Sequence, residues 1–86
     1  MSEPLSIRTA ILEMAAARGD AKTFCPSEIA RQIGGSDEKR WRLLMSPIRT
    51  EAVRLADEGA IVLLRKGRPV DPHDFKGIYR IRLPKG

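Results

Sequence analysis

Two kinds of side chain in this 86-residue chain could carry out chemistry at a single site: one cysteine, and one histidine among aspartates. Cys25 is the only cysteine, so the chain can form no intrachain disulfide and no cysteine-based zinc site. This pattern is typical of a reducing cytoplasm. Nothing close to Cys25 in the sequence would activate its thiol as a nucleophile.

His73 is the only histidine, and Asp71 and Asp74 flank it. These three side chains could ligate a metal loosely, but their spacing matches no common metal site. A solvated turn is the simpler interpretation. The chain also contains no phosphate-binding glycine loop, because Gly34–Gly35 lacks the lysine and the strand that such a loop requires. We therefore expect no catalytic centre, no metal and no cofactor, and we do not expect an enzyme.

The basic residues are concentrated at one end of the chain. Residues 1–63 contain nine Lys or Arg and nine Asp or Glu, whereas residues 64–86 contain seven bases and two acids. The whole net charge of +5 therefore belongs to the last quarter of the sequence. Such segregation indicates an anionic partner. Nucleic acid is the first candidate, and an acidic protein or lipid surface is the second. Alternatively, the excess charge only keeps a small protein soluble.

Four helical segments precede this basic region. Apolar residues at helical spacing predict a first helix around Ile7–Ala15, which Gly19 ends. Pro26 fits the first position of a second helix, and Gly34–Gly35 ends it. Ser36 is placed to cap a short third helix, and Ser46 to cap a fourth that runs to Gly59.

The basic region itself predicts a β-hairpin. Ile61–Arg65 and Ile78–Leu83 are strand-like, and twelve residues of turn formers and charges separate them. In the second strand, Ile81 alternates with Arg80 and Arg82. One face of the strand therefore packs on the core, and the two arginines lie on the opposite face. Thr23–Cys25 could add a short third strand beside the hairpin.

These elements predict one α+β domain over residues 1–86, of the winged helix-turn-helix class. It has three or four helices, a small antiparallel sheet and a C-terminal β-hairpin wing. The connection from Ile33 to Pro47 is longer than a usual helix-turn-helix turn and contains the short helix.

No run of about 18 apolar residues is present, and Glu3, Arg8 and Glu13 interrupt any signal sequence, so we expect a cytoplasmic protein and no membrane partner.

Several stretches taken together resemble a bacterial family of small uncharacterised winged-helix domains, classed as a domain of unknown function. They are CPSEIAR, WRLLMSPIRTEAVRLADEGAI, GRPVDP and KGIYRIRL, and the likeness runs from the first helix to Leu83. The residues that match the recurring pattern are Cys25, Pro26, Ser27, Glu28, Trp41, Arg49, Gly67, Pro69, Asp71 and Pro72. The resemblance implies a winged-helix fold and, by analogy with other winged helices, DNA binding. It implies no assigned activity.

The first functional hypothesis is a DNA-binding protein, and possible roles include a small transcriptional regulator. The fourth helix would approach bases, and the wing would hold the duplex backbone. The residues expected at this interface are Arg49, Thr50, Arg54, Arg65, Lys66, Arg68, Lys76, Arg80 and Arg82. The alternative is a protein interaction module for an acidic partner, with no nucleic acid. Acidic residues on the fourth helix favour that alternative, and they are equally typical of a solvated helix face. The sequence leaves the oligomeric state open.

Overall fold

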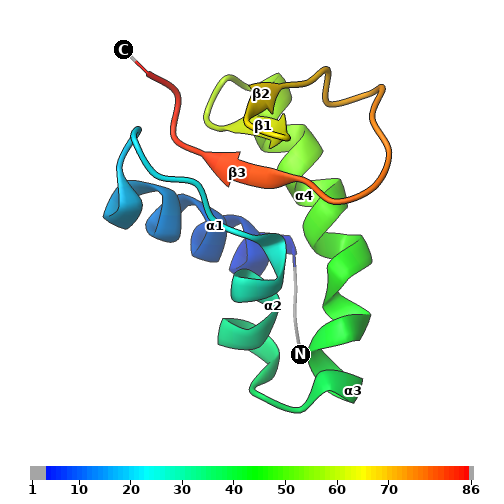
Figure 1. The fold of residues 1–86 in the computed structure, drawn as a ribbon. Helices are drawn as coiled ribbons and strands as arrows, with labels where there is room; N and C mark the ends of the chain where they lie inside the picture. The colour runs from blue at the N-terminus through cyan, green and yellow to red at the C-terminus, as the bar shows by residue number, and fades with distance from the viewer. Residues whose placement is uncertain (1–3, 86) are drawn as a thin grey trace.

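The computed structural model describes residues 4–85 and shows an α+β protein in which a small sheet lies across one end of the helices (Figure 1). The helices are α1 (Pro4–Arg18), α2 (Pro26–Gly34), α3 (Glu38–Trp41), the 3-10 helix η1 (Arg42–Leu44) and α4 (Met45–Asp57). The strands are β1 (Val62–Arg65), β2 (Arg68–Pro69) and β3 (Arg80–Arg82). The predicted α+β class and small antiparallel sheet are confirmed.

Helix α1 follows the predicted apolar stripe. Ile7, Ile11 and Ala15 are buried on one side of the helix. The helix ends before Gly19, whose φ of 77° lies in the left-handed region that glycine reaches without steric strain. The stripe packs α1 against α2 and α4, so it forms core and no ligand site.

Helix α2 starts as the sequence indicates, with Pro26 in its first turn and Cys25 at the N-cap position. The backbone N–H of Cys25 donates to Oε2 of Glu28 at 2.9 Å. This bond fixes the direction in which the chain enters the helix, because it satisfies an amide that has no backbone acceptor within the helix.

The region between α2 and α4 differs from the prediction. Asp37, and not Ser36, caps α3, because its side chain accepts a hydrogen bond from the backbone N–H of Lys39 at 3.0 Å. Helix α4 begins at Met45, directly after η1, so Ser46 lies inside the first turn instead of capping it. The segment after Asp37 is therefore nearly continuous helix, since a proline at position 47 costs no hydrogen bond within the first turn.

The sheet has the strand order β2-β1-β3, with β1 in the centre. The predicted pairing of β1 with β3 is confirmed, and it places Leu63 opposite Ile81. The twelve-residue tip was predicted as one long loop, and this detail is wrong. Lys66 and Gly67, with φ of 52° and 81°, form a tight turn after which Arg68–Pro69 pairs with β1 on its other side. Pro69 suits an edge strand, where a missing N–H is tolerated.

The predicted third strand at Thr23–Cys25 is reduced to one residue pair. Phe24 and Ile81 exchange both backbone hydrogen bonds at 2.9 Å, and neither side chain is exposed to solvent. This bridge ties the connection between α1 and α2 to the edge of β3. The core then lies between the helices and the inner face of the sheet, and its largest members are Ile7, Ile11, Phe24, Ile29, Ile48, Leu55, Leu63 and Ile81.

Candidate functional site

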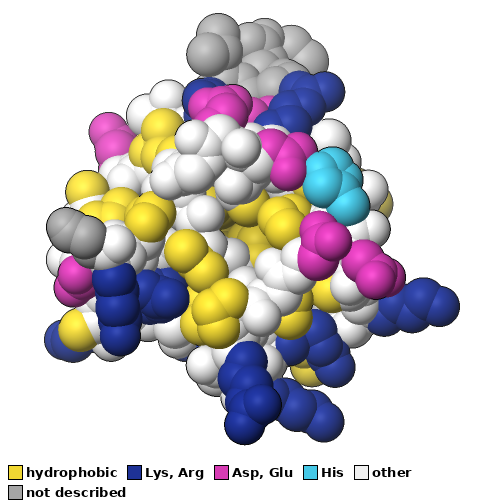
Figure 2. Space-filling view, turned by 90° about the horizontal axis from the view of Figure 1, so that it is seen from above, with side chains coloured by type: hydrophobic (Ala, Val, Ile, Leu, Met, Phe, Trp, Pro, Cys, Tyr) yellow, Lys and Arg dark blue, Asp and Glu magenta, His cyan; other side chains and the backbone are white. Residues whose placement is uncertain are grey.

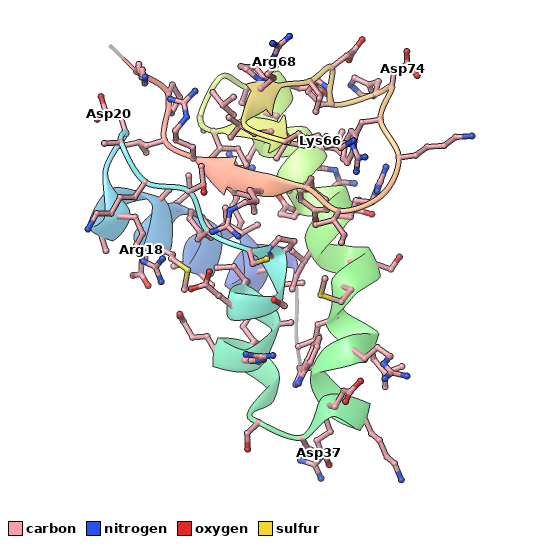
Figure 3. All side chains as sticks on the ribbon, in the orientation of Figure 1. Arg18, Asp20, Asp37, Lys66, Arg68 and Asp74 are labelled. Carbon is pink, nitrogen blue, oxygen red and sulfur yellow. The ribbon has the colours of Figure 1, made fainter. Side chains whose placement is uncertain are left out.

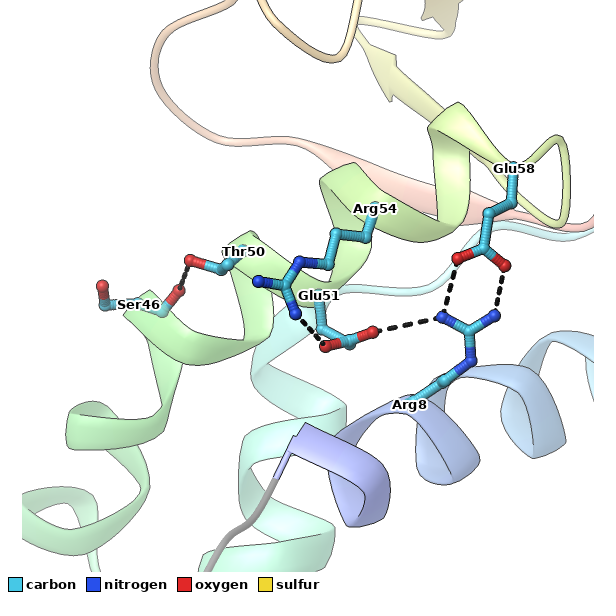
Figure 4. Close-up of polar contacts among 6 residues, drawn as sticks. All are labelled: Arg8, Ser46, Thr50, Glu51, Arg54 and Glu58. Atoms are coloured by element: carbon cyan, nitrogen blue, oxygen red, sulfur yellow. Dashed lines mark hydrogen bonds and ion pairs between the residues drawn. The ribbon is translucent and has the colours of Figure 1, made fainter.

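Four basic side chains of the helices, Arg8, Arg18, Arg42 and Arg54, form ion pairs with acids of the same part of the molecule. Arg8 on α1 donates hydrogen bonds to Glu58, one of them 2.9 Å long, and approaches Glu51 at 3.3 Å (Figure 4). Its hydrogen bonds to Glu58 raise the pKa of Arg8 and lower the pKa of Glu58. Glu51 is only 4% exposed, and Arg54 approaches its other oxygen at 3.6 Å. This cluster joins the N-terminal half of α1 to α4 and neutralises its own charges.

Two more ion pairs lie within the helical part. Arg18 donates to Glu28 at 2.6 Å, and Arg42 pairs with Glu38 one turn before it in the chain. The backbone N–H of Cys25, and then Arg18, lowers the pKa of Glu28. Glu28, Glu38, Glu51 and Glu58 are thus paired with bases of the helical part of the molecule.

The bases of the C-terminal region have a different environment. Within residues 4–85, none of the seven Lys and Arg after Leu63 forms an ion pair with a carboxylate. Three of them donate to neutral acceptors instead. Arg65 donates to the carbonyl of Ile78 at 2.7 Å, and Arg80 to the hydroxyl of Thr23 at 2.6 Å.

Arg82 donates to the carbonyls of Asp20 at 3.4 Å and Leu83 at 3.1 Å. Such bonds orient a guanidinium but leave its positive charge intact, and the group keeps further donors.

The remaining predicted wing bases are exposed. Lys66 stands in the tight turn, Arg68 on the edge strand and Lys76 in the connection to β3. Lys66 and Arg68 lie at the sheet end of the molecule, opposite Asp37 at the far end of the helices (Figure 3). The structure brings Arg65, Lys66 and Arg80 around one shallow depression of about 500 Å³.

We call residues 60–85 the basic sheet unit. Viewed from the sheet end, Lys and Arg side chains form groups around the edge of the molecule, with hydrophobic side chains between them (Figure 2). Acidic side chains gather near the histidine on one part of this face. The bases therefore flank the acidic turn at Asp71–Asp74 and do not cover it.

Arg49 was predicted to approach DNA, but the structure gives it a role within the fold. Its guanidinium lies 4.1 Å from the ring centroid of Phe75 and 5.9 Å from that of Tyr79. It also donates to the carbonyl of Phe75 at 2.9 Å. Arg49 thus fastens the connection between β2 and β3 onto α4, a contact that sequence spacing alone gives no sign of.

The two other predicted residues of α4 are exposed. Thr50 donates to the carbonyl of Ser46 at 3.3 Å, within its own helix (Figure 4). Arg54 keeps 63% of its side chain exposed while it approaches Glu51. Thr50 and Arg54 are exposed on the outer face of α4, whereas Arg49 is only partly exposed.

His73 also connects the basic sheet unit to α4. Its Nε2 lies 2.7 Å from Oδ2 of Asp57, near the end of α4. The predicted solvated turn is correct in that 63% of the His73 side chain is exposed, but the pairing with Asp57 was not predicted. Across residues 4–85, no group of three or more His, Cys, Asp or Glu is arranged to hold a metal ion.

A pocket of about 580 Å³ lies where the starts of α2 and α4 meet the segment before β3. Its lining residues are Cys25, Pro26, Ser27, Met45, Ser46, Arg49, Gly77, Ile78 and Tyr79. The sequence gives no direct sign of this pocket, because its walls come from three separate parts of the chain.

The sequence profile of a family described as "Protein of unknown function (DUF3253)" matches residues 4–84. The chain belongs to the DUF3253 family. The match covers every helix and strand of this DUF3253 fold. No curated protein matches the chain. Among the residues described, this DUF3253 protein has no helix long and apolar enough to cross a membrane.

Proposed function

We propose that this chain is a winged-helix protein that binds duplex DNA, with its basic sheet unit on the phosphate backbone. The observation that supports the proposal is the separation of charge in three dimensions. Four bases of the helices, Arg8, Arg18, Arg42 and Arg54, pair with acids of the same part of the molecule, whereas in the part of the chain described, no Lys or Arg of the basic sheet unit has a carboxylate partner. An anion from outside the protein would supply the missing negative charge.

The arrangement of the bases suits phosphates. Arg65, Lys66 and Arg80 surround one depression, so a phosphate there would meet donors from two strands and a turn. Arg68 and Lys76 are exposed on either side of the long connection and would reach neighbouring phosphates. Contacts of this kind give affinity and position but no base preference.

Base reading by α4 is a smaller part of the proposal. Arg49 stacks on the Phe75 ring and donates to the Phe75 carbonyl. Thr50 and Arg54 are therefore the predicted residues of α4 that could reach a groove. The acids Asp57 and Glu58 on the same helix would repel phosphates. We therefore expect affinity to depend far more on the basic sheet unit than on α4, and a role as a small transcriptional regulator would need base contacts from Thr50 and Arg54.

The test compares two double variants of equal charge change in fluorescence anisotropy with a labelled random-sequence duplex. Lys66→Gln with Arg68→Gln removes two bases from the basic sheet unit, and Lys39→Gln with Arg40→Gln removes two exposed bases from α3. Each phosphate contact makes log K fall by about 0.9 for each tenfold rise in salt, so the loss of two contacts lowers affinity by about 60-fold at about 0.1 M salt, one decade below about 1 M. The control variant should lose much less. Equal losses for the two variants would show that only net charge matters.

A second candidate function is a protein interaction module that binds an acidic partner. The mixed charge of the outer face of α4, where Arg54, Asp57 and Glu58 lie together, favours it. A pull-down with the wild-type chain and with the Lys66/Arg68 double variant separates the two functions. Recovery of one stoichiometric protein, without nucleic acid and only by the wild type, would favour the interaction module.

A further inference from the structure

The pocket between α2, α4 and the segment before β3 has an apolar wall. Pro26, Met45 and Ile78 contribute to its lining. Ile78 is 81% exposed at the rim of the pocket, so its side chain is available for an apolar contact with a ligand. A volume of about 580 Å³ lies within the range of about 300–1,000 Å³ that is common for small-molecule sites.

The same pocket holds a polar group that the protein leaves unused. Tyr79 lines the pocket and is 5% exposed, and its hydroxyl is buried without a hydrogen-bond partner among the residues described. Buried hydroxyls are normally paired, because removing one from water without a partner costs free energy. An unpaired hydroxyl on a residue that lines a pocket therefore indicates a hydrogen bond that a ligand would make once it reaches this covered atom.

The surroundings of this hydroxyl define what it can do. Burial is the main cause that raises the pKa of Tyr79 to about 12. The charge of Arg49 lowers this pKa, and Cys25 raises it. The hydroxyl is thus protonated at neutral pH and able to donate, and it lies within electrostatic reach of two other pocket residues. Arg49 adds a positive charge that is held in place by its stacking on Phe75.

A further donor comes from the start of α2. Ser27 lies in the first turn, where backbone N–H groups have no acceptor inside the helix, and it lines the pocket. Among the residues whose side chains the structure describes, no acidic one lines the pocket. Hydrogen-bond donors and positive charge thus adjoin an apolar wall in one cavity.

We propose that this pocket binds a small amphipathic carboxylate, with its apolar body against Met45 and Ile78 and its carboxylate at the Tyr79 hydroxyl and Arg49. A carboxylate can accept hydrogen bonds from both groups at once. The wall is too apolar for a heavily charged ligand such as a nucleotide triphosphate. The inference does not depend on DNA binding, since Arg49 and Tyr79 line this pocket and not the depression at Arg65, although Gly77 and Ile78 border both.

The test titrates the isotope-labelled full chain with hexanoate and, separately, with 1-hexanol, which has a similar apolar body but no charge. Amide resonances of Ser27, Met45 and Tyr79, which line the pocket and not the depression at Arg65, report on binding in two-dimensional NMR spectra. We expect saturable shifts with hexanoate and at least about tenfold weaker binding of 1-hexanol, as the loss of a hydrogen bond to a charged group implies. No saturable shift up to about 10 mM hexanoate, or equal affinity for the two probes, would overturn the proposal.

Tyr79→Phe tests the hydroxyl directly, because the variant keeps the ring and removes only the unpaired group. We expect hexanoate affinity to fall about tenfold, 1-hexanol affinity to stay the same and the melting temperature not to decrease. A lower melting temperature would show that the hydroxyl has a partner inside the protein, and unchanged hexanoate affinity would show that it does not meet the ligand. Either result would overturn the assignment.

Ile78→Glu tests the rim of the pocket from an exposed position, so that folding is little affected. Leu43→Glu is the matched control, because Leu43 is 77% exposed on η1 and does not line the pocket. We expect the first variant to lose hexanoate binding through charge repulsion and lost apolar contact, and the second to keep it. Equal effects of the two variants would place the ligand elsewhere.

Discussion

Arg49→Ala distinguishes a structural role of this arginine from a role in reading DNA. The structure gives the guanidinium a hydrogen bond to the carbonyl of Phe75 at 2.9 Å and a stacking contact with the Phe75 ring at 4.1 Å. A hydrogen bond that involves a charged group contributes about 1.5–3 kcal/mol, and a partly desolvated cation–π contact about 1 kcal/mol. The half-exposed setting reduces both contributions, and we expect a loss of about 2 kcal/mol in the free energy of unfolding.

For a domain of this size, about 2 kcal/mol lowers the melting temperature by about 8–16 °C. Circular dichroism melts measure this change, and faster amide exchange at Gly77 and Ile78 should accompany it, since Arg49 holds that segment on α4. Arg54→Ala is the control, because Arg54 is 63% exposed and Glu51 keeps its contact with Arg8. If Arg49→Ala melts like the wild type but binds DNA less well, Arg49 acts as a DNA contact and the structural role is refuted.

Three further changes test other parts of the fold. Glu51→Gln should lower the free energy of unfolding by about 1–3 kcal/mol in urea denaturation, because it weakens a buried pairing with Arg8, and a change below about 0.5 kcal/mol would contradict the buried cluster. The pKa of Glu28 lies below its usual 4.5 in the folded state, so its stabilising effect is present above that pH and is lost as the pH falls through the folded value. Melts from about pH 6 to pH 3 should therefore show a smaller acid loss for Glu28→Gln than for the wild type, and equal losses would contradict this. Gly67→Ala should destabilise the chain by about 1 kcal/mol in the same denaturation assay, because its φ of 81° is strained for alanine; no change would contradict the tight turn.

Local signals account for the parts of the fold that the sequence predicted. Gly19 and Pro26 act within one turn of their own position, so the end of α1 and the start of α2 follow from residue type alone. Ser46 and Pro47 were ambiguous, since a proline after a serine fits both a new helix start and the first turn of a helix already begun. The structure has the second arrangement, because η1 ends at Leu44 and α4 begins directly after it at Met45.

The strand Arg68–Pro69 was missed because its pairing depends on the left-handed turn at Lys66–Gly67, and a lysine there gives a weak signal. In the candidate site, the segregation of charge was visible in the sequence, since it requires only counting. The stacking of Arg49 on Phe75 and the meeting of Cys25 with Tyr79 were not visible, because both depend on how the long connection folds back onto the helices.

The salt dependence of DNA affinity tests the central claim most directly. The measurement is the dissociation constant of the wild-type chain for a random-sequence duplex, by fluorescence anisotropy, at several salt concentrations. If the basic sheet unit contacts three to six phosphates, log K should fall with log salt with a slope between about −3 and −5. A slope near zero, or no binding at tens of micromolar protein in low salt, would contradict the claim that this surface binds the phosphate backbone.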